Sequence, residues 1–296
     1  RTDLRDVFTP AAWILKDNRL RYAGYDRLDF ESVWDLGADA ALEYESMRSE
    51  TPECLFHALE QSGNWCLRSG WDRNADYLHF KCGSLGGGHG HFDKLHVDLS
   101  IAGEDVLIDS GRYTYVDGSL RRQLKSSCAH NVPVVDWQEY TQCTGSWDVK
   151  GRTAPAGQDW SQKGPYTFLQ GTHLGYLPAG VLVNRRIISI GTRIHMIADA
   201  CFVSGCHCQH GAGQSGFPPQ TDAGCVFQLV IVKGHRSLFQ LHFAAAPTRP
   251  RGHPVKRCLC PNSMVQKDIL PHFHASGGIQ MEYLAQHMGS RSIKFI

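Results

Sequence analysis

The sequence predicts a mainly β protein, an antiparallel β-sandwich that follows a short helical segment. Residues 29–49 carry apolar side chains at helical spacing, whereas from about residue 54 the pattern changes to short extended runs separated by turns. Many short strands with short connections and few helices are typical of two packed antiparallel sheets. We therefore divide the chain into a helical domain over residues 1–53 and a β-sandwich domain over residues 54–296.

The expected elements follow in chain order. The helical stretch carries Phe30, Val33, Trp34, Ala38, Ala41, Leu42 and Met47 and ends before Pro52, because the residue before a proline disfavours helix. Residues 102–105 suit a hairpin loop, and residues 204–224, rich in Gly, Pro and Gln, suit a surface loop. We expect strands over 77–80, 96–101, 106–108, 132–135, 181–183, 185–190, 193–197, 226–232, 238–243 and 279–284.

The composition is that of an ordinary globular protein, with 42% hydrophobic and 20% charged residues and a net charge of +1. A chain so nearly neutral has no global field for nucleic acid or acidic lipid, and no apolar run is long enough to cross a bilayer. We expect the 11 cysteines to be mostly unpaired, which leans toward a reducing compartment. The chain starts at Arg1 and ends in a strand-like run, so we interpret it as a fragment. The lack of a signal peptide at its start therefore gives no information about export.

Three short motifs bring metal-binding residue types together. A glycine run, Gly86-Gly87-Gly88, precedes His89-Gly90-His91, and Asp109 and His130 follow further on. His-x-His on an extended segment directs both rings to one face, because side chains in strands repeat every two residues. Two or three histidines with one carboxylate suit zinc or a non-haem iron.

Together with residues 66–72, 106–115 and 130–136, these motifs resemble the heparinase II/III-like polysaccharide lyases, which include alginate and oligoalginate lyases. The resemblance covers roughly residues 55 to 245, with several motifs in order. It implies that a helical toroid precedes the sandwich, so that residues 1–53 would be the tail of a largely missing toroid. It also implies an anionic, uronate-containing oligo- or polysaccharide as the partner and a periplasmic, envelope or secreted location, while the unpaired cysteines keep the cytoplasm open.

The resemblance assigns a structural zinc to His91, Asp109 and His130, at the three matching motif positions. The alternative is that the three are hydrogen-bonded polar residues at a strand end. Asp93 suits a supporting role, in which it accepts the N–H of an imidazole and orients the ring.

His89 is our candidate for catalysis, because histidine titrates near neutral pH and the preceding glycines let a ligand approach closely. It could instead be a further metal ligand or a structural polar residue. Tyr113 or Tyr115 would supply the tyrosine that the family places near the sugar, although both could be packing residues. Arg121 and Arg122 could clamp a carboxylate or sulfate, or form a solvated basic turn.

Two further clusters look like metal sites but fit poorly. Residues 206–210 (Cys-His-Cys-Gln-His) are too crowded for a usual zinc finger, and no complementary cysteine pair lies at finger spacing. Residues 272–274 (His-Phe-His) are equally isolated. We interpret both as chance clusters in loops.

The leading functional hypothesis is a lyase that cleaves a uronic acid glycan by β-elimination, with substrate of the heparin, heparan sulfate or alginate type. By resemblance, the toroid supplies a tyrosine and an asparagine or histidine, and the sandwich supplies His89, so the fragment would hold half of an active site. The alternatives are a cupin-like metal-dependent oxygenase, which would hold iron, and a non-catalytic carbohydrate-binding sandwich. The sequence leaves the oligomeric state open.

Overall fold

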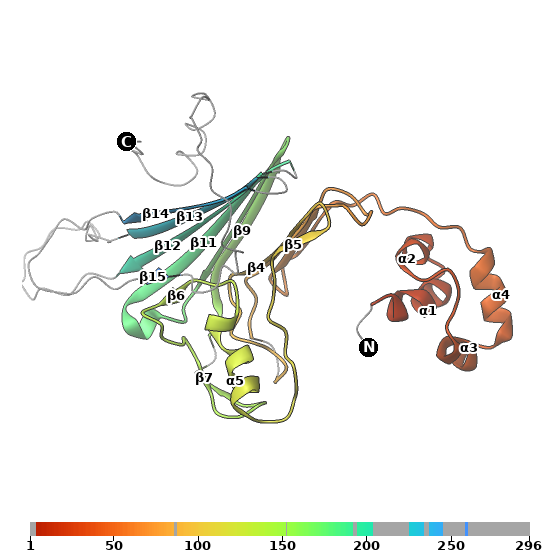
Figure 1. Cartoon of the computed structure of the whole chain (residues 1–296), viewed down its shortest axis with the longest axis horizontal. Coiled ribbons are helices and arrows are strands. Elements are labelled where there is room, and N and C mark those ends of the chain that lie inside the picture. The colour runs from red at the N-terminus through yellow and green to blue at the C-terminus, as the bar shows by residue number, and fades with distance from the viewer. Residues whose placement is uncertain are drawn as a thin grey trace, which may run out of the picture. The chain divides into compact units, whose positions relative to one another are not determined.

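A computed structural model of the chain describes residues 4–85, 88–151, 153–191, 194–203, 225–233, 237–244 and 258–259, the last three ranges as backbone only. Four short helices come first, and antiparallel strands make up most of the remainder (Figure 1). The expected fold class, mainly antiparallel β after a helical segment, is confirmed. The last of these helices ends at Ser46 and the first strand begins at Phe56, on either side of the expected boundary.

The helical segment consists of α1 (Arg5–Leu15), α2 (Asn18–Ala23), α3 (Phe30–Leu36) and α4 (Ala38–Ser46). The carboxylates of Asp17 and Asp29 accept backbone N–H groups and so begin α2 and α3. Gly37, with φ 92°, separates α3 from α4, so the helical stretch expected over 29–49 is two helices. Ala40 and Tyr44 are buried, but Trp34 is 79% exposed, so the expected apolar face is only partly covered in the described chain.

The first sheet has five antiparallel strands in chain order: β1 (Phe56–Leu59), β2 (Asn64–Arg68), β3 (Tyr77–Lys81), β4 (His96–Ile101) and β5 (Glu104–Leu107). Ala102 and Gly103, with φ 51° and 79°, form the turn between β4 and β5. Two left-handed residues match the twist of a hairpin and form a complete two-residue turn. The loop is therefore residues 102–103 rather than the expected 102–105.

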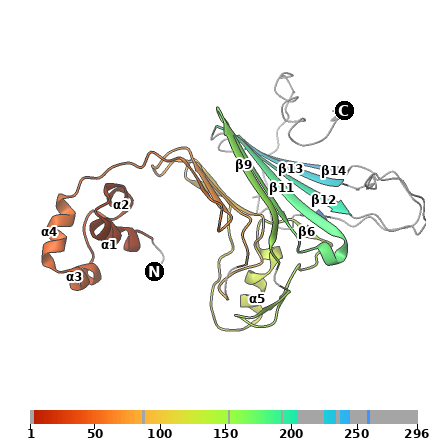
Figure 2. The same cartoon turned by 180° about the vertical axis from the view of Figure 1, so that it is seen from behind.

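The second sheet has six antiparallel strands in the order β14-β13-β12-β11-β10-β9, seen from behind in Figure 2. A single strand, β11, replaces the two strands expected over 181–183 and 185–190. The strands are β9 (Pro155–Lys163), β10 (Tyr166–His173), β11 (Val181–Ile190), β12 (Ile194–Val203), β13 (Cys225–Lys233) and β14 (Ser237–Ala244).

The two sheets share one hydrophobic core, which contains Trp65 and Phe80 from the first sheet and Leu169 and Ile187 from the second. The sheets approach closely at Gly171, where an added Cβ would lie 2.7 Å from Cys82 Sγ and from Leu95 Cδ2. This packing holds in place the loop that follows β3 and the residue that precedes β4.

The segment between the sheets holds a helix that the sequence did not reveal, α5 (Ser119–Lys125), followed by a 3-10 turn over Ser127–Ala129. The same segment also holds short strands. β7 (Gln142–Cys143) pairs with β8 (Val149–Lys150), and β6 (Val134–Val135) pairs with β15 (Cys258–Leu259), which follows the second sheet in the chain. The expected loop 204–224, the strand 279–284 and the clusters 206–210 and 272–274 lie outside the described residues. No helix among the described residues is long and apolar enough to span a membrane.

Candidate active site and metal centre

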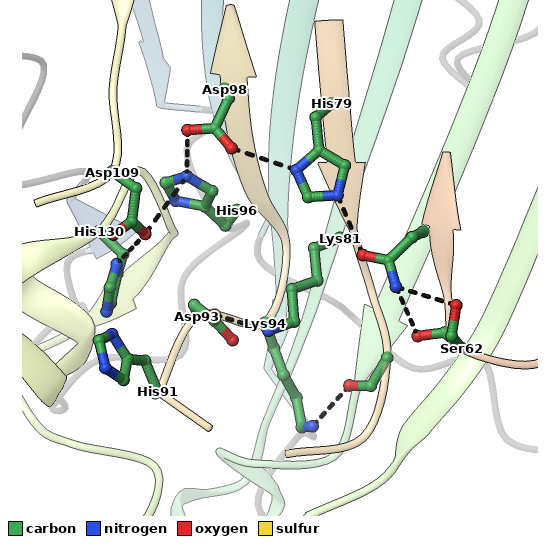
Figure 3. Close-up of polar contacts among 12 residues, drawn as sticks. Ser62, His79, Lys81, His91, Asp93, Lys94, His96, Asp98, Asp109 and His130 are labelled. Carbon is green, nitrogen blue, oxygen red and sulfur yellow. Dashed lines mark hydrogen bonds and ion pairs between the residues drawn. The ribbon is translucent and has the colours of Figure 1, made fainter. Parts of the chain in front are cut away.

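The structure brings His91, Asp109 and His130 together. One potential ligand atom from each lies within 4.8 Å of those of the other two. His91 precedes β4, Asp109 follows the end of β5, and His130 follows the 3-10 turn, so three separate segments meet at this point. Nδ1 of His130 lies 2.8 Å from Oδ2 of Asp109 (Figure 3). The centres of the His91 and His130 rings are 5.2 Å apart.

The donor set fits a zinc ion. Nε2 of His130 is buried and has no hydrogen-bond partner among the described residues, which is costly unless something else binds this nitrogen. Two imidazoles and a carboxylate form an ordinary zinc shell that leaves a fourth position for water or another ligand.

The ionisation states suit a metal as well. Burial, aided by the charges of His130 and Arg121, lowers the pKa of His91 to about 4, so this ring is neutral at physiological pH. Burial by itself would raise the pKa of Asp109, but the hydrogen bond and charge of His130 overcome it and lower the pKa to about 2. A neutral imidazole and an ionised carboxylate are the forms that bind a metal.

Arg121 lies beside the same centre. Its Nη1 is 2.8 Å from Nε2 of His91, and since a guanidinium can only donate, this Nε2 carries a lone pair rather than a proton. A metal that binds His91 through Nε2 would take the place of this hydrogen bond. The side chain of Arg121 is 1% exposed, with Nε and Nη2 unpaired among the described residues.

A second layer of polar residues supports the centre (Figure 3). The backbone N–H of Asn131 donates to Nδ1 of His96, so the proton of this ring is on Nε2, which lies 2.9 Å from Oδ1 of Asp98. The other Asp98 oxygen lies 3.1 Å from Nδ1 of His79 on β3. Nε2 of His96 is also 3.7 Å from Oδ2 of Asp109, so this layer directly backs the carboxylate of the centre.

This layer was not predicted from the sequence, although the sequence carries a signal for it. His96 and Asp98 are two apart on β4 and so share a face, and β-sheet register places His79 opposite Asp98. Asp93 was expected to orient an imidazole. It instead accepts from Nζ of Lys81 at 2.7 Å and makes no hydrogen bond to an imidazole among the described residues.

Replacing Asp98 by asparagine is expected to lower the free energy of unfolding by about 1–3 kcal/mol, because a neutral amide replaces the charged carboxylate that binds the imidazoles of His96 and His79. Thermal unfolding of the whole protein measures the effect. The control is Asp105→Asn on neighbouring β5, whose carboxylate is exposed, with an expected change within about 0.5 kcal/mol. Equal stability of Asp98→Asn and wild type would show that the layer contributes nothing.

His89 lies in an exposed aromatic cluster next to the centre. Its Nδ1 is 3.0 Å from the hydroxyl of Tyr115, and its ring is 5.0 Å from those of both Tyr115 and Trp147. Trp147 lies between β7 and β8 and was not anticipated from the sequence. Tyr113 is 76% exposed and has φ 57°, so the segment is not extended there, and no described residue in the His89 cluster contacts its ring. The structure therefore pairs His89 with Tyr115.

Gly90 is required between the two histidines, because a Cβ there would lie 1.9 Å from the carbonyl oxygen of Leu85. A Cβ on Gly88 would lie 3.2 Å from Trp147. These contacts explain the glycine pattern of this loop in terms of packing around the His-Gly-His segment, while Gly86 and Gly87 lie outside the described residues.

The two arginines of α5 differ in exposure and in their partners. Arg122 is exposed and paired with the carboxylate of Asp117, whereas Arg121 is buried beneath Tyr115 and His91. The two guanidiniums thus have different partners in this structure, and the segment is a helix rather than a basic turn. A third arginine, Arg112, has its guanidinium carbon 4.0 Å from the centre of the Tyr115 ring. Arg112 and Arg121 thus both place a guanidinium near the Tyr115 ring of the His89 cluster.

The structure is thus an antiparallel β-sandwich in which a His-Gly-His loop, a strand-end aspartate and a His-Asn turn meet at one point. Residues 51–247 match the family described as Heparinase II/III-like, C-terminal, which is more than half of the chain. The chain belongs to this family.

Similarity to individual proteins is consistent with this family. The chain is 28% identical over 108 residues to a heparin-sulfate lyase of Pedobacter heparinus. The aligned region is 34% of this chain and 16% of that protein. The crystal structure of the heparan sulfate lyase HepC from Pedobacter heparinus matches 68% of this chain and 28% of its own, with 19% identity and a TM-score of 0.50. A heparinase III structure matches 80% of this chain and 37% of its own, with 14% identity and a TM-score of 0.51. At these identities the two structures show the common fold, and this chain spans well under half of each relative.

Proposed function

We propose that the whole protein is a polysaccharide lyase that cleaves a uronic-acid-containing glycan by β-elimination. The observation that carries this proposal is the hydrogen-bonded pair of His89 and Tyr115, two proton-transfer groups exposed to solvent next to Arg112. Family membership supports the reaction class, and similarity to a heparin-sulfate lyase and a heparan sulfate lyase favours a heparin or heparan sulfate substrate over alginate.

The elimination makes three demands on the protein. The carboxylate of the uronate must be neutralised, the C5 proton removed, and the oxygen leaving C4 protonated. His89 and Tyr115 share one hydrogen bond, so one can accept a proton while the other donates one. The guanidiniums of Arg112 and Arg121, both near the Tyr115 ring, provide positive charge for a carboxylate and for the enolate-like intermediate.

His91, Asp109 and His130 would hold a structural zinc in this account. The ion would tie the loop that carries His89 to the end of β5 and to the turn after α5. It would stabilise this arrangement, since metal binding couples to folding. The buried, unpaired Nε2 of His130 is the observation that supports it.

The test is a screen of the whole protein against heparin, heparan sulfate, alginate and other uronates, which follows the ultraviolet absorbance of the unsaturated sugar. We expect activity on a heparin-type polymer. Metal analysis of the same protein separates this account from a metal-dependent oxygenase: zinc fits the lyase, whereas redox-active iron with no unsaturated product would contradict it. Glycan binding without product would identify a carbohydrate-binding sandwich.

A further inference from the structure

A pocket of about 650 Å³ has Asp109 in its lining but none of the residues of the His89 cluster, so the elimination site does not account for its role. Its walls come from the end of β5, from α5 and the following 3-10 turn, and from Trp137. The volume is within the range of small-molecule sites, roughly 300–1,000 Å³. Because Asp109 belongs both to this lining and to the candidate metal centre, the pocket adjoins the proposed active site.

Trp137 has an unfavourable backbone conformation for its residue type. Asp136 and Trp137 have φ 50° and 58°, and Val135 pairs with Gln138 across them, so they form a tight turn of two left-handed residues. Glycine or asparagine suits such positions, whereas a bulky side chain there costs of order 1–3 kcal/mol. The turn itself therefore gives no reason for a tryptophan.

The indole is not explained by packing either. Trp137 is 57% exposed, and its ring makes no hydrogen bond or ring contact with any described residue. An exposed aromatic residue in the lining of a pocket suits a ligand platform, because a rigid indole presents a large apolar face at little entropic cost.

The chemistry of the lining selects the ligand. Among the described residues that line the pocket, none is a lysine or an arginine, and Asp109 is the charged one. Apolar side chains such as Val106 and Leu124 alternate with neutral polar ones such as Ser110 and Gln123. A sulfate or carboxylate in this pocket would find no positively charged side chain in the described lining and would be repelled by Asp109. An uncharged sugar ring, in contrast, offers an apolar C–H face to an indole and hydroxyls to the neutral polar groups.

We propose that this pocket binds an uncharged sugar residue of the glycan, with Trp137 stacked on the apolar face of its ring. The proposal rests on the proposed function for the polymer to which that sugar belongs. The anionic uronate lies at His89, Tyr115 and Arg112, and the neutral neighbour occupies the Trp137 pocket. Trp137 is then a specificity-determining residue for the lyase.

The test uses Trp137→Gly in the whole protein. Glycine adopts the left-handed turn without strain, so we expect the melting temperature to stay the same or rise. Loss of the stacking platform should raise KM about 10-fold and leave kcat within about twofold, since Trp137 is not among the residues that contact His89. Trp137→Phe should keep part of the affinity. Lys16→Gly removes another left-handed residue, outside the pocket, and should change neither KM nor kcat.

Binding is measured separately by titration of the whole protein with N,N′-diacetylchitobiose, a neutral probe, using tryptophan fluorescence. We expect binding that is lost in Trp137→Gly. If wild type releases no unsaturated product but binds the probe through Trp137, the lyase proposal fails and the sugar subsite remains. If wild type is active but Trp137→Gly has an unchanged KM, or a lower melting temperature with unchanged binding, Trp137 is structural and the subsite is overturned. Displacement of the probe by inorganic sulfate would contradict an uncharged ligand.

Discussion

Replacing His89 by alanine is expected to lower kcat on the uronate polymer by about 10²–10⁴-fold, the usual cost of losing a general acid or base. His89 is exposed and hydrogen-bonded only to Tyr115 among the described residues, so its removal should leave zinc content and melting temperature near those of wild type. Steady-state kinetics of the whole enzyme, with metal analysis and thermal unfolding of the same preparations, measure all three quantities.

The matched control is His57→Ala, which removes another exposed histidine, on β1, and should leave kcat unchanged. A different pattern would reassign His89. If the variant loses zinc while its residual metal-loaded fraction is fully active, His89 is a ligand and the catalytic role belongs elsewhere.

Replacing His91 by alanine is expected to reduce the zinc content to background and to lower stability. A ligand that binds only the folded state adds about 2.7 kcal/mol when its free concentration is 100 times its Kd. Removing this contribution should therefore lower the melting temperature by several degrees, and adding a chelator should reduce the melting temperature of wild type but not that of the variant.

His57→Ala again serves as the control and should retain both zinc and the response to chelator. Full metal content in purified His91→Ala protein would remove His91 from the proposed ligand set. Loss of stability without any change in metal content would mean that His91 is a packing residue.

The sequence predicted most strands with a clear apolar pattern, but β1, β2 and β10 were missed, although side-chain burial alternates along β2 and β10. Residues 96–101 alternate strictly, and β4 has the same bounds. Strand β9 was missed because it lies at the edge of its sheet, where most of its side chains are exposed and polar and the alternation is weak. Helix α5 has seven residues, too few for a period to stand out.

The candidate site could be predicted where motifs in chain order were sufficient. His91, Asp109 and His130 were found from their residue types, and the structure brings them together. Residues that reach the site through tertiary packing were not found, among them Trp147 beside His89 and His79 behind Asp98. The choice between Tyr113 and Tyr115 depended on the left-handed backbone of Tyr113, which residue spacing does not reveal.

The most direct test of the central claim is the mass of the products formed by the whole protein from a defined heparin-type oligosaccharide in heavy-oxygen water. Elimination breaks the bond at C4 without adding water. The account therefore predicts fragments whose masses sum to that of the substrate, one with an unsaturated uronate end and neither with heavy oxygen. Incorporation of heavy oxygen into a saturated product would show hydrolysis and contradict the account.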